Sequence, residues 1–331
     1  MSILVTGSSG YIGSRLVRRF HDRGETVFGV DRLPYEGACL DEAVTGDLLE
    51  ASTLEETPMA VDCICHLAAA KGDWGISKDE YYRDNLEVTR AIIEAGKNAG
   101  VKDWVFYSTV STLGPHHQPV DEDADFNPIN PYGASKAEAE RLFRQLAGED
   151  PEVRVLIIRP SVVYGPGNPP NTNIYRLVDA IYNRRFAMVG SGEAIKSTSY
   201  IENLLDATLF SMDRMKRGVQ TYIYIDEPVL TTWTLVERIY RLLGKTPPSW
   251  QIPLGVASTI AAVSDFAADL TGIDFPITAA RIEKFNRSTN FDASKIREEG
   301  FEQPVSNEEA LRKTVAWHLR HEYGMSLPKD A

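Results

Sequence analysis

Short apolar runs alternate with longer segments of helical spacing through most of the chain. The runs at 3–5, 26–30, 61–67, 102–108, 153–158 and 221–225 have the length of buried strands, whereas 84–98, 132–147, 174–183, 200–212 and 231–243 have the spacing of helices. Strands and helices that alternate in this way predict an α/β fold with a doubly wound parallel sheet. Beyond Pro247 and Pro248 the pattern is less regular, and helices mix with short extended segments.

Three glycines, Gly7, Gly10 and Gly13, connect the first predicted strand to the first predicted helix. At this spacing glycines allow a tight turn, bring backbone N–H groups against a pyrophosphate, and let the helix pack closely on the strand. The amino end of the helix adds a positive dipole. The second strand ends at Asp31, whose carboxylate can bind both ribose hydroxyls and repel a 2′-phosphate. These features predict dinucleotide binding and favour NAD, although Arg32 beside Asp31 leaves NADP open.

Further candidates for the same cofactor follow other predicted strands. Asp47 comes directly after a short strand, where its carboxylate can accept a hydrogen bond from the adenine amine or cap a helix before Leu48. The sequence leaves both roles open. The small residues Ala68 and Ala69 follow the strand 61–67, so the backbone there can lie against a cofactor.

Tyr132 and Lys136 lie at the start of a predicted helix, directly after Pro131. Their spacing puts both side chains on one helical face. A free tyrosine titrates near about 10 and is a poor base at neutral pH. A nearby ammonium, the helix amino end and a bound nicotinamide cation would each lower that pKa. The pair is therefore a candidate base with its activating cation, or else a surface tyrosine with a solvated lysine.

Composition and charge exclude several classes of function. The 331 residues are 43% hydrophobic and 25% charged, as in ordinary globular proteins, and the net charge of -12 argues against a nucleic-acid partner. Three cysteines provide no disulfide framework, and Cys63 and Cys65 alternate on a predicted strand, which argues against a metal or redox site. No secretory signal is recognised, and the apolar stretch 254–270 is interrupted by Asp265 and Asp269. We expect a cytoplasmic protein without stable membrane insertion.

Taken together, the motifs resemble the extended short-chain dehydrogenase/reductase superfamily, in particular its NAD-dependent nucleotide-sugar epimerase/dehydratase branch. The matching segments are 6–13, 66–69, 159–168, 188–192 and 196–203. The last three are similar to bacterial members from polysaccharide biosynthesis clusters. The resemblance implies an NAD-binding Rossmann domain and a smaller mixed α/β substrate domain. We expect the first from 1–165 and 201–240 and the second from 166–200 and 241–331.

The resemblance also implies a role for individual residues. Catalysis is implied for Thr109, Tyr132 and Lys136. Cofactor binding is implied for Gly7, Gly10, Tyr11, Ile12, Gly13, Asp31, Arg32, Asp47, Leu48, Leu67, Ala68, Ala69, Lys71, Asn85, Tyr132, Lys136 and Pro160. Substrate binding is implied for Lys71, Thr109, Asn173, Lys196 and Arg281, and no metal is expected.

Two departures from the family pattern bear on the reaction. Lys196 stands where the family often has an arginine against the substrate diphosphate, and lysine keeps the charge without the bidentate geometry. Dehydratases of this branch place an Asp-Glu pair directly after the catalytic threonine. Val110 and Ser111 follow Thr109 here, so the acid/base pair for water elimination is missing.

The resemblance therefore implies an epimerase of a nucleotide-diphosphate sugar, similar to UDP-glucose or UDP-GlcNAc 4-epimerases, that works through a transient keto-sugar with Tyr132 as base. One alternative is an NAD(P)-dependent reductase or dehydrogenase of a keto-sugar or a hydroxysteroid-like alcohol, which the apolar tract 252–275 keeps open. Another is a non-catalytic NAD-binding sensor, although such a protein has no use for the tyrosine–lysine pair.

A homodimer is expected by analogy with relatives that pair through a four-helix bundle. The helices would be 84–98 and 132–147. Their candidate apolar contacts are Ile92, Leu142 and Phe143.

Overall fold

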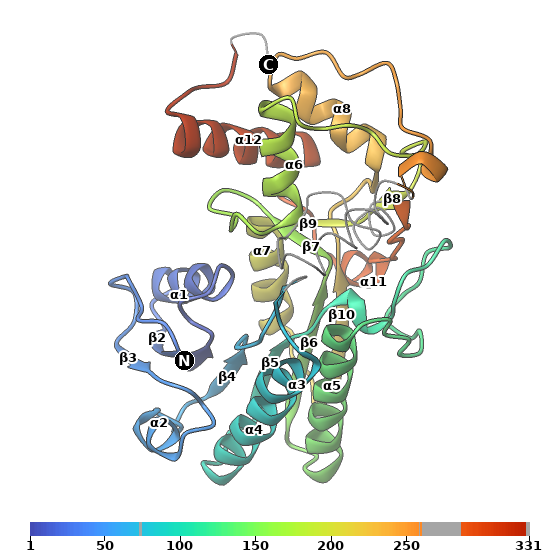
Figure 1. Cartoon of the computed structure of the whole chain (residues 1–331). Coiled ribbons are helices and arrows are strands. Elements are labelled where there is room, and N and C mark those ends of the chain that lie inside the picture. Colours follow the sequence, from blue (N-terminus) through green and yellow to red (C-terminus); the bar gives the residue numbers. More distant parts are fainter. Residues whose placement is uncertain (73–74, 258, 260–285, 329–331) are drawn as a thin grey trace.

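The computed structural model describes residues 1–72, 75–257, 259 and 286–328, and its centre is a sheet of seven parallel strands (Figure 1). The strands are β1 (Ser2–Thr6), β2 (Thr26–Asp31), β3 (Glu42–Thr45), β4 (Cys63–His66), β5 (Asp103–Tyr107), β6 (Arg154–Pro160) and β10 (Gly218–Tyr224). They lie in the order β10-β6-β5-β4-β1-β2-β3. This doubly wound arrangement confirms the α/β Rossmann fold predicted from the sequence.

The strand order reverses between β1 and β4, which are neighbours in the sheet but not in the chain. Thr6 at the end of β1 pairs with His66 at the end of β4, so the loops that follow these two strands leave the sheet side by side. In doubly wound folds, ligands bind in the crevice outside the carboxyl ends of the strands at such a reversal. The topology alone therefore locates the site.

Helices cover both faces of the sheet. Side chains alternate across a strand, so Ile3 and Val5 point to one face and Leu4 to the other. The first face is covered by α1 (Gly13–Asp22) and α7 (Ile201–Met212), and the second by α2 (Ala51–Glu56), α4 (Val88–Asn98) and α5 (Pro131–Glu149). No helix in the described ranges has both the length and the apolar character needed to cross a bilayer.

The helix expected at 84–98 begins earlier and is irregular. Its first segment is α3 (Lys78–Tyr82), where the Ser77 hydroxyl accepts a hydrogen bond from the Glu80 N–H and the Glu80 carboxylate accepts one from the Ser77 N–H. A π-helical turn (Arg83–Glu87) then leads into α4. Such turns are rare and often lie at functional sites.

Two of the three apolar residues expected at a dimer interface are in the core of the monomer instead. Ile92 and Phe143 have no exposed surface and pack in the cluster under α4 and α5. That assignment is wrong, because an apolar helix face does not reveal whether it packs on its own sheet or on a partner. Leu142 is half-buried.

A second group of helices lies beyond the carboxyl edge of the sheet (Figure 1). It contains α6 (Asn173–Tyr182), α8 (Thr232–Leu242) and α12 (Asn307–Tyr323), which pack on one another. The predicted division placed α8 with the cofactor domain. The short α11 (Ser294–Glu298), from the predicted substrate part, lies against β10.

Four short strands connect the second group to the sheet. In these, β7 (Val162–Tyr164) pairs in parallel with β9 (Thr198–Tyr200), and β8 (Ile195–Lys196) pairs antiparallel with β11 (Leu230–Thr231). They were not predicted, since segments of two or three residues have no apolar period. A single apolar cluster runs from the sheet face under α1 into α6, α8 and α12.

Candidate active site

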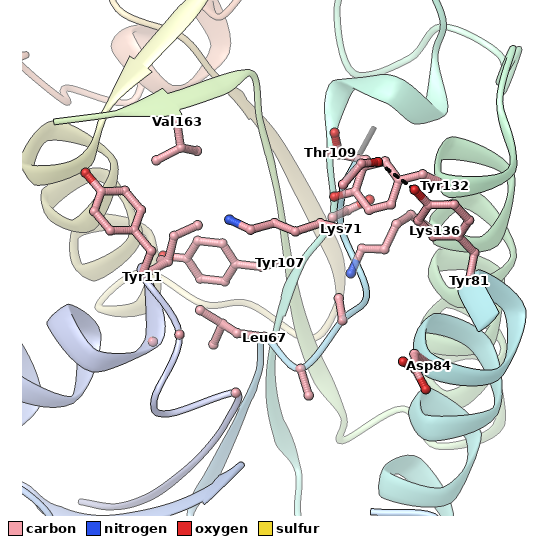
Figure 2. A pocket seen from close by; sticks show the side chains of 18 of the residues that line it. Tyr11, Leu67, Lys71, Tyr81, Asp84, Tyr107, Thr109, Tyr132, Lys136 and Val163 are labelled. Atoms are coloured by element: carbon pink, nitrogen blue, oxygen red, sulfur yellow. Dashed lines mark hydrogen bonds between the residues drawn. The ribbon is translucent and has the colours of Figure 1, made fainter. Parts of the chain in front are cut away.

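A cavity of about 800 Å³ opens at the carboxyl edge of the sheet. Its walls come from the ends of β1, β2, β4, β5 and β6, from the amino ends of α1 and α5, and from the start of α6 (Figure 2). A crevice of this size at the reversal of strand order can hold a dinucleotide and a substrate together.

In the turn between β1 and α1, the glycines let backbone segments lie too close together for any side chain. Gly7 has a φ of 73°, and a Cβ at this position would come within 2.7 Å of the Ala68 nitrogen. A Cβ on Gly13 would overlap the Gly7 carbonyl oxygen. No side chain among the described residues caps α1, and its first turn carries no acidic residue. The N–H groups of Ser14 and Arg15 already donate to the carbonyls of Gly10 and Ile12. The glycine turn before them and the positive dipole of the helix end fit a pyrophosphate.

The predicted ribose carboxylate is fixed in place by backbone groups. The Ser9 N–H and the Leu33 N–H donate to the two oxygens of Asp31, each at 3.0 Å. Asp31, Arg32, Asp47 and Leu48 all line the same end of the cavity. Asp47 does not cap α2: its Oδ1 accepts from the Leu49 N–H at 3.0 Å, and the helix begins after Glu50.

The wall formed by Leu67, Ala68 and Ala69 is held by the threonine of β1. The Thr6 Oγ1 accepts hydrogen bonds from the N–H groups of Leu67 and Ala68 at 3.2 and 3.1 Å. It also lies 2.7 Å from the Nδ1 of His66, which is fully buried. Burial lowers the pKa of His66 to about 3, so the ring stays neutral and supports the strand end.

Asn85 lies behind this wall and is not among the described residues that line the cavity. Its Oδ1 accepts from the Ala70 N–H at 2.7 Å, and its Nδ2 donates to the Ala70 carbonyl at 3.2 Å and to the Ser135 hydroxyl at 2.9 Å. The side chain thus joins the wall to helix α5. Asn85 therefore supports the cavity wall from behind, and its side chain does not line the cavity.

The three predicted catalytic residues converge on the cavity (Figure 2). Thr109 follows β5, and its Oγ1 accepts from the Ser111 N–H at 3.1 Å. Tyr132 lies in the first turn of α5, which begins where Asn130 caps the Gly133 N–H at 2.7 Å. A hydrogen bond joins the side chains of Thr109 and Tyr132.

Lys136 lies one turn further along α5, with only 2% of its surface exposed. Its Nζ is 4.0 Å from the centre of the Phe106 ring and has no hydrogen-bond partner among the described residues. Burial lowers the pKa of Lys136 to about 7, while the Glu140 carboxylate opposes that change. An unpartnered ammonium at the cavity wall fits the ribose hydroxyls of a dinucleotide.

Burial also changes the pKa of Tyr132, the predicted base. It raises the pKa of Tyr132 to about 12, and the hydrogen bond with Thr109 opposes the rise. Without a ligand, Tyr132 is therefore protonated at neutral pH.

A buried ion pair supports the predicted catalytic residues from behind. The Arg159 Nε and Nη2 donate to the two oxygens of Glu140 at 2.9 and 2.8 Å, and the Ser108 hydroxyl donates to the same carboxylate at 2.5 Å. Neither charged residue of the pair is more than 1% exposed. Arg159 lies on β6 and Ser108 follows β5, so the Glu140 carboxylate joins both strands to α5. These contacts lie next to Thr109 and one turn beyond Lys136.

Of the predicted substrate residues, Lys71, Thr109 and Asn173 line the cavity, whereas Lys196 does not. Lys71 extends across the cavity (Figure 2), and desolvation by the surrounding protein lowers its pKa. Asn173, the first residue of α6, lines the opposite wall. The Lys196 Nζ donates to the Arg287 carbonyl at 2.6 Å, and Lys196 is not among the described lining residues. Arg281 lies outside the described residues, as does most of the tract 252–275.

Several lining residues were not predicted. They include Leu33, Ile76, Tyr81, Asp84, Tyr107, Val163, Asn171 and Thr289. Tyr107 is the last residue of β5, so a search of all strand ends would have found it. Thr289 comes from a distant segment that no local pattern connects to the site. Within the described ranges, no cluster of three or more His, Cys, Asp or Glu side chains has a metal-binding arrangement.

The fold and site define a class of Rossmann-fold dinucleotide enzyme that pairs a tyrosine with a lysine on one helix. The family model described as "NAD dependent epimerase/dehydratase family" matches residues 3–225. The chain therefore belongs to this family, as the motifs indicated, and its cofactor is NAD.

Individual relatives cover nearly the whole chain. One is an N-acetyl-alpha-D-glucosaminyl-diphospho-ditrans,octacis-undecaprenol 4-epimerase of Escherichia coli O157:H7, which is 29% identical and aligns over 97% of this chain and 96% of its own length. Another is a 2-alkyl-3-oxoalkanoate reductase of Stenotrophomonas maltophilia, 28% identical over 96% of this chain and 99% of its own. The solved structure of MoeE5 in complex with UDP-glucose and NAD is 27% identical, with a TM-score of 0.73 over 97% of this chain and 100% of that one.

Proposed function

We propose that this protein is an NAD-dependent epimerase of a nucleotide-diphosphate sugar. The observation that carries the proposal is the convergence of Thr109, Tyr132 and Lys136 on the cavity that also contains the glycine turn. Val110 and Ser111 follow Thr109, so the acid pair of a dehydratase is missing. The epimerase among the relatives and the UDP-glucose complex of MoeE5 support this choice.

In the proposed reaction Tyr132 takes the proton of the sugar hydroxyl while Thr109 donates a hydrogen bond to the same oxygen. When bound, NAD would supply the hydride chemistry: it would accept hydride from that carbon and give it back to the other face of the ketone once the ketone has turned over in the pocket. Lys136 donates to the cofactor ribose and, as an ammonium, stabilises the tyrosinate. Tyr132 then returns its proton to the oxygen of the inverted centre.

The pKa values that the protein itself gives to Tyr132 and Lys136 fit this order of events. Tyr132 has a pKa of about 12 and Lys136 one of about 7, so neither is prepared for catalysis in the absence of ligand. Hydrogen bonds from Lys136 to ribose hydroxyls and the positive charge of the oxidised nicotinamide shift both values toward the charged forms. We infer that the base becomes competent only after the cofactor is in place.

The proposal predicts that turnover leaves the cofactor oxidised. Substrate deuterated at the reacting carbon should keep most of its label in the epimerised product, and absorbance of reduced nicotinamide should not change over many turnovers. UDP-sugars and a polyprenyl-diphosphate sugar form the panel, because the relatives act on or bind both kinds. Product is resolved by NMR.

NADH that accumulates or is consumed in proportion to product would contradict the epimerase and favour a reductase. The reductase is the second candidate, and the 28%-identical 2-alkyl-3-oxoalkanoate reductase favours it. The same three residues would serve it, but the cofactor would have to exchange in every cycle.

We also propose that Lys196 contributes to binding of the substrate diphosphate. Its ammonium lies on β8 and now donates to the Arg287 carbonyl, so a diphosphate would compete with that contact. Lys196→Ala should raise KM for the sugar substrate more than it lowers kcat, because the diphosphate takes no part in the chemistry. Steady-state kinetics check this, with Lys216→Ala, on the loop between α7 and β10, as a charge-matched control. A loss confined to kcat would assign Lys196 to the chemistry instead.

The remaining proposals concern assembly and location. A homodimer would use the outer sides of α4 and α5, where Leu142 is the remaining apolar candidate. We propose a cytoplasmic enzyme of polysaccharide biosynthesis. The composition and the epimerase relative support this assignment.

A further inference from the structure

Arg32 is the residue of this site whose charge does not fit the use of NAD. It directly follows Asp31 and lines the ribose end of the cavity. In Rossmann folds an arginine at this place accommodates the 2′-phosphate of NADP, whereas the carboxylate before it selects for NAD. The sequence therefore contains one residue that favours NAD, Asp31, and one that favours NADP, Arg32. The structure shows which groups bind the Arg32 guanidinium instead of a phosphate.

The guanidinium of Arg32 is occupied by carboxylates on other elements. Its Nη1 and Nη2 donate to the two oxygens of Asp84 at 2.7 and 2.6 Å, a bidentate pair. Nη2 also lies 3.0 Å from the Oδ2 of Asp47. Both carboxylates are well shielded, with 15% and 16% of their side chains exposed, against 46% for Arg32.

A second arginine closes the cluster. Arg83 donates to Asp84 at 2.6 Å and also binds Asp47, so each carboxylate holds both guanidinium groups. The pKa of Asp84 is lowered, first by its hydrogen bond from Arg32, and the carboxylate stays ionised. Together with Asp31 the cluster has more carboxylates than guanidinium groups, and this end of the cavity keeps a net negative charge.

The irregular helix places these side chains. Arg83 and Asp84 open the π-helical turn, and the next residue, Asn85, already faces the wall at Ala70. Consecutive residues can thus reach the ribose end and the wall from one turn of the helix. An isolated surface ion pair is worth little, but this one is bidentate, shared and inside the cavity.

We propose that Asp84 is a cofactor-specificity residue: by holding Arg32 within the carboxylate cluster, it keeps the guanidinium from a 2′-phosphate and makes the protein selective for NAD over NADP. The proposal rests on NAD binding and on Asp31 as the ribose carboxylate. It does not depend on the epimerase reaction.

The experiment is calorimetric titration of NAD and NADP into the protein and its variants. Asp84→Asn should improve the affinity for NADP relative to NAD by about tenfold, since one partly screened charge is removed and Arg32 loses its bidentate partner and keeps only its contact with Asp47. The control Glu87→Gln removes the same charge from the same helical turn, where Glu87 pairs with Arg90, and should leave the ratio unchanged.

Two double variants identify the group responsible. Asp84→Asn with Arg32→Ala should lose the gain for NADP, and Asp84→Asn with Arg83→Ala should keep it. A gain that persists without Arg32, or a ratio unchanged by Asp84→Asn, would overturn the proposal.

Arg32→Ala alone gives an independent test should Asp84→Asn not fold. Arg32→Ala removes a positive charge from the carboxylate cluster, so its effect on the ratio should match that of Arg83→Ala, which removes the same charge from the same two carboxylates. If Arg32→Ala weakens NADP binding selectively and Arg83→Ala does not, Arg32 already reaches the phosphate and the proposal is wrong. Because the readout is cofactor affinity, it stands apart from the label experiment that tests the epimerase.

Discussion

Tyr132→Phe should lower turnover by about 10²–10⁴-fold, the usual contribution of a general acid–base group, while NAD binds almost as before. The substitution removes only the hydroxyl that we propose to exchange its proton with the substrate. The aromatic ring keeps its contact with Tyr81, whose centroid is 5.9 Å away. Steady-state rates on the active sugar, with NAD affinity by calorimetry, measure the two effects separately.

The matched control is Tyr182→Phe on α6. That hydroxyl contacts the Met325 sulfur at 2.9 Å and does not line the cavity, so the same chemical change should leave the rate almost unchanged. If Tyr132→Phe retained a rate close to the wild type, the base would have to be sought elsewhere, and Lys71, which extends across the cavity, would be the next candidate.

Glu140→Ala should destabilise the fold by about 3–5 kcal/mol, because removal of one partner leaves the other charge buried without compensation. Arg159 is 1% exposed, and its remaining hydrogen bond goes to the Glu122 carbonyl at 3.0 Å. The Ser108 hydroxyl loses its acceptor at the same time. Urea unfolding followed by circular dichroism gives the difference in the free energy of unfolding.

Glu138→Ala provides the comparison on the same helix. Glu138, with 45% of its side chain exposed, pairs with Arg141 at the surface, where such pairs contribute about 0–1 kcal/mol. Equal losses for the two variants would show that the Glu140–Arg159 pair has no special structural role. The effect on catalysis should follow that on stability, since Ser108 and Lys136 flank the pair along β5 and α5.

The sheet and the chemistry at its edge were accessible from the sequence because both depend on local order. The run at 3–5, the glycines after it and Asp31 lie within one strand–helix–strand unit, and each residue has the place that the pattern assigned. The same holds for Tyr132 and Lys136, which share one helical turn. The cavity gathers them because parallel strands present their carboxyl ends to one side.

What the sequence could not provide depends on distant contacts. Lys196 has the expected charge, but the direction of its side chain depends on a hydrogen bond to the Arg287 carbonyl, which belongs to a remote segment. Asn85 has the expected position in the chain, yet a π-helical turn aims it at the wall and leaves Asp84 in the cavity. Ile92 and Phe143 are apolar as predicted, and only the packed structure shows which surface they cover.

The four short strands between the sheet and the second group of helices, α6, α8 and α12, restrict movement between these two parts. Strands β7 and β9 are hydrogen-bonded to each other, β8 is bonded to β11, and Lys196 forms a further bridge with Thr289. A hinge needs a few residues that rotate freely, whereas these crossings are interlocked and one apolar core continues through them. We therefore expect the two walls of the cavity to move as a single rigid frame. A dinucleotide would have to leave through the mouth, past side chains such as Tyr11 and Lys71, without the frame opening. Slow release of the dinucleotide suits an epimerase, because the reaction regenerates the oxidised cofactor in every cycle and no exchange is needed.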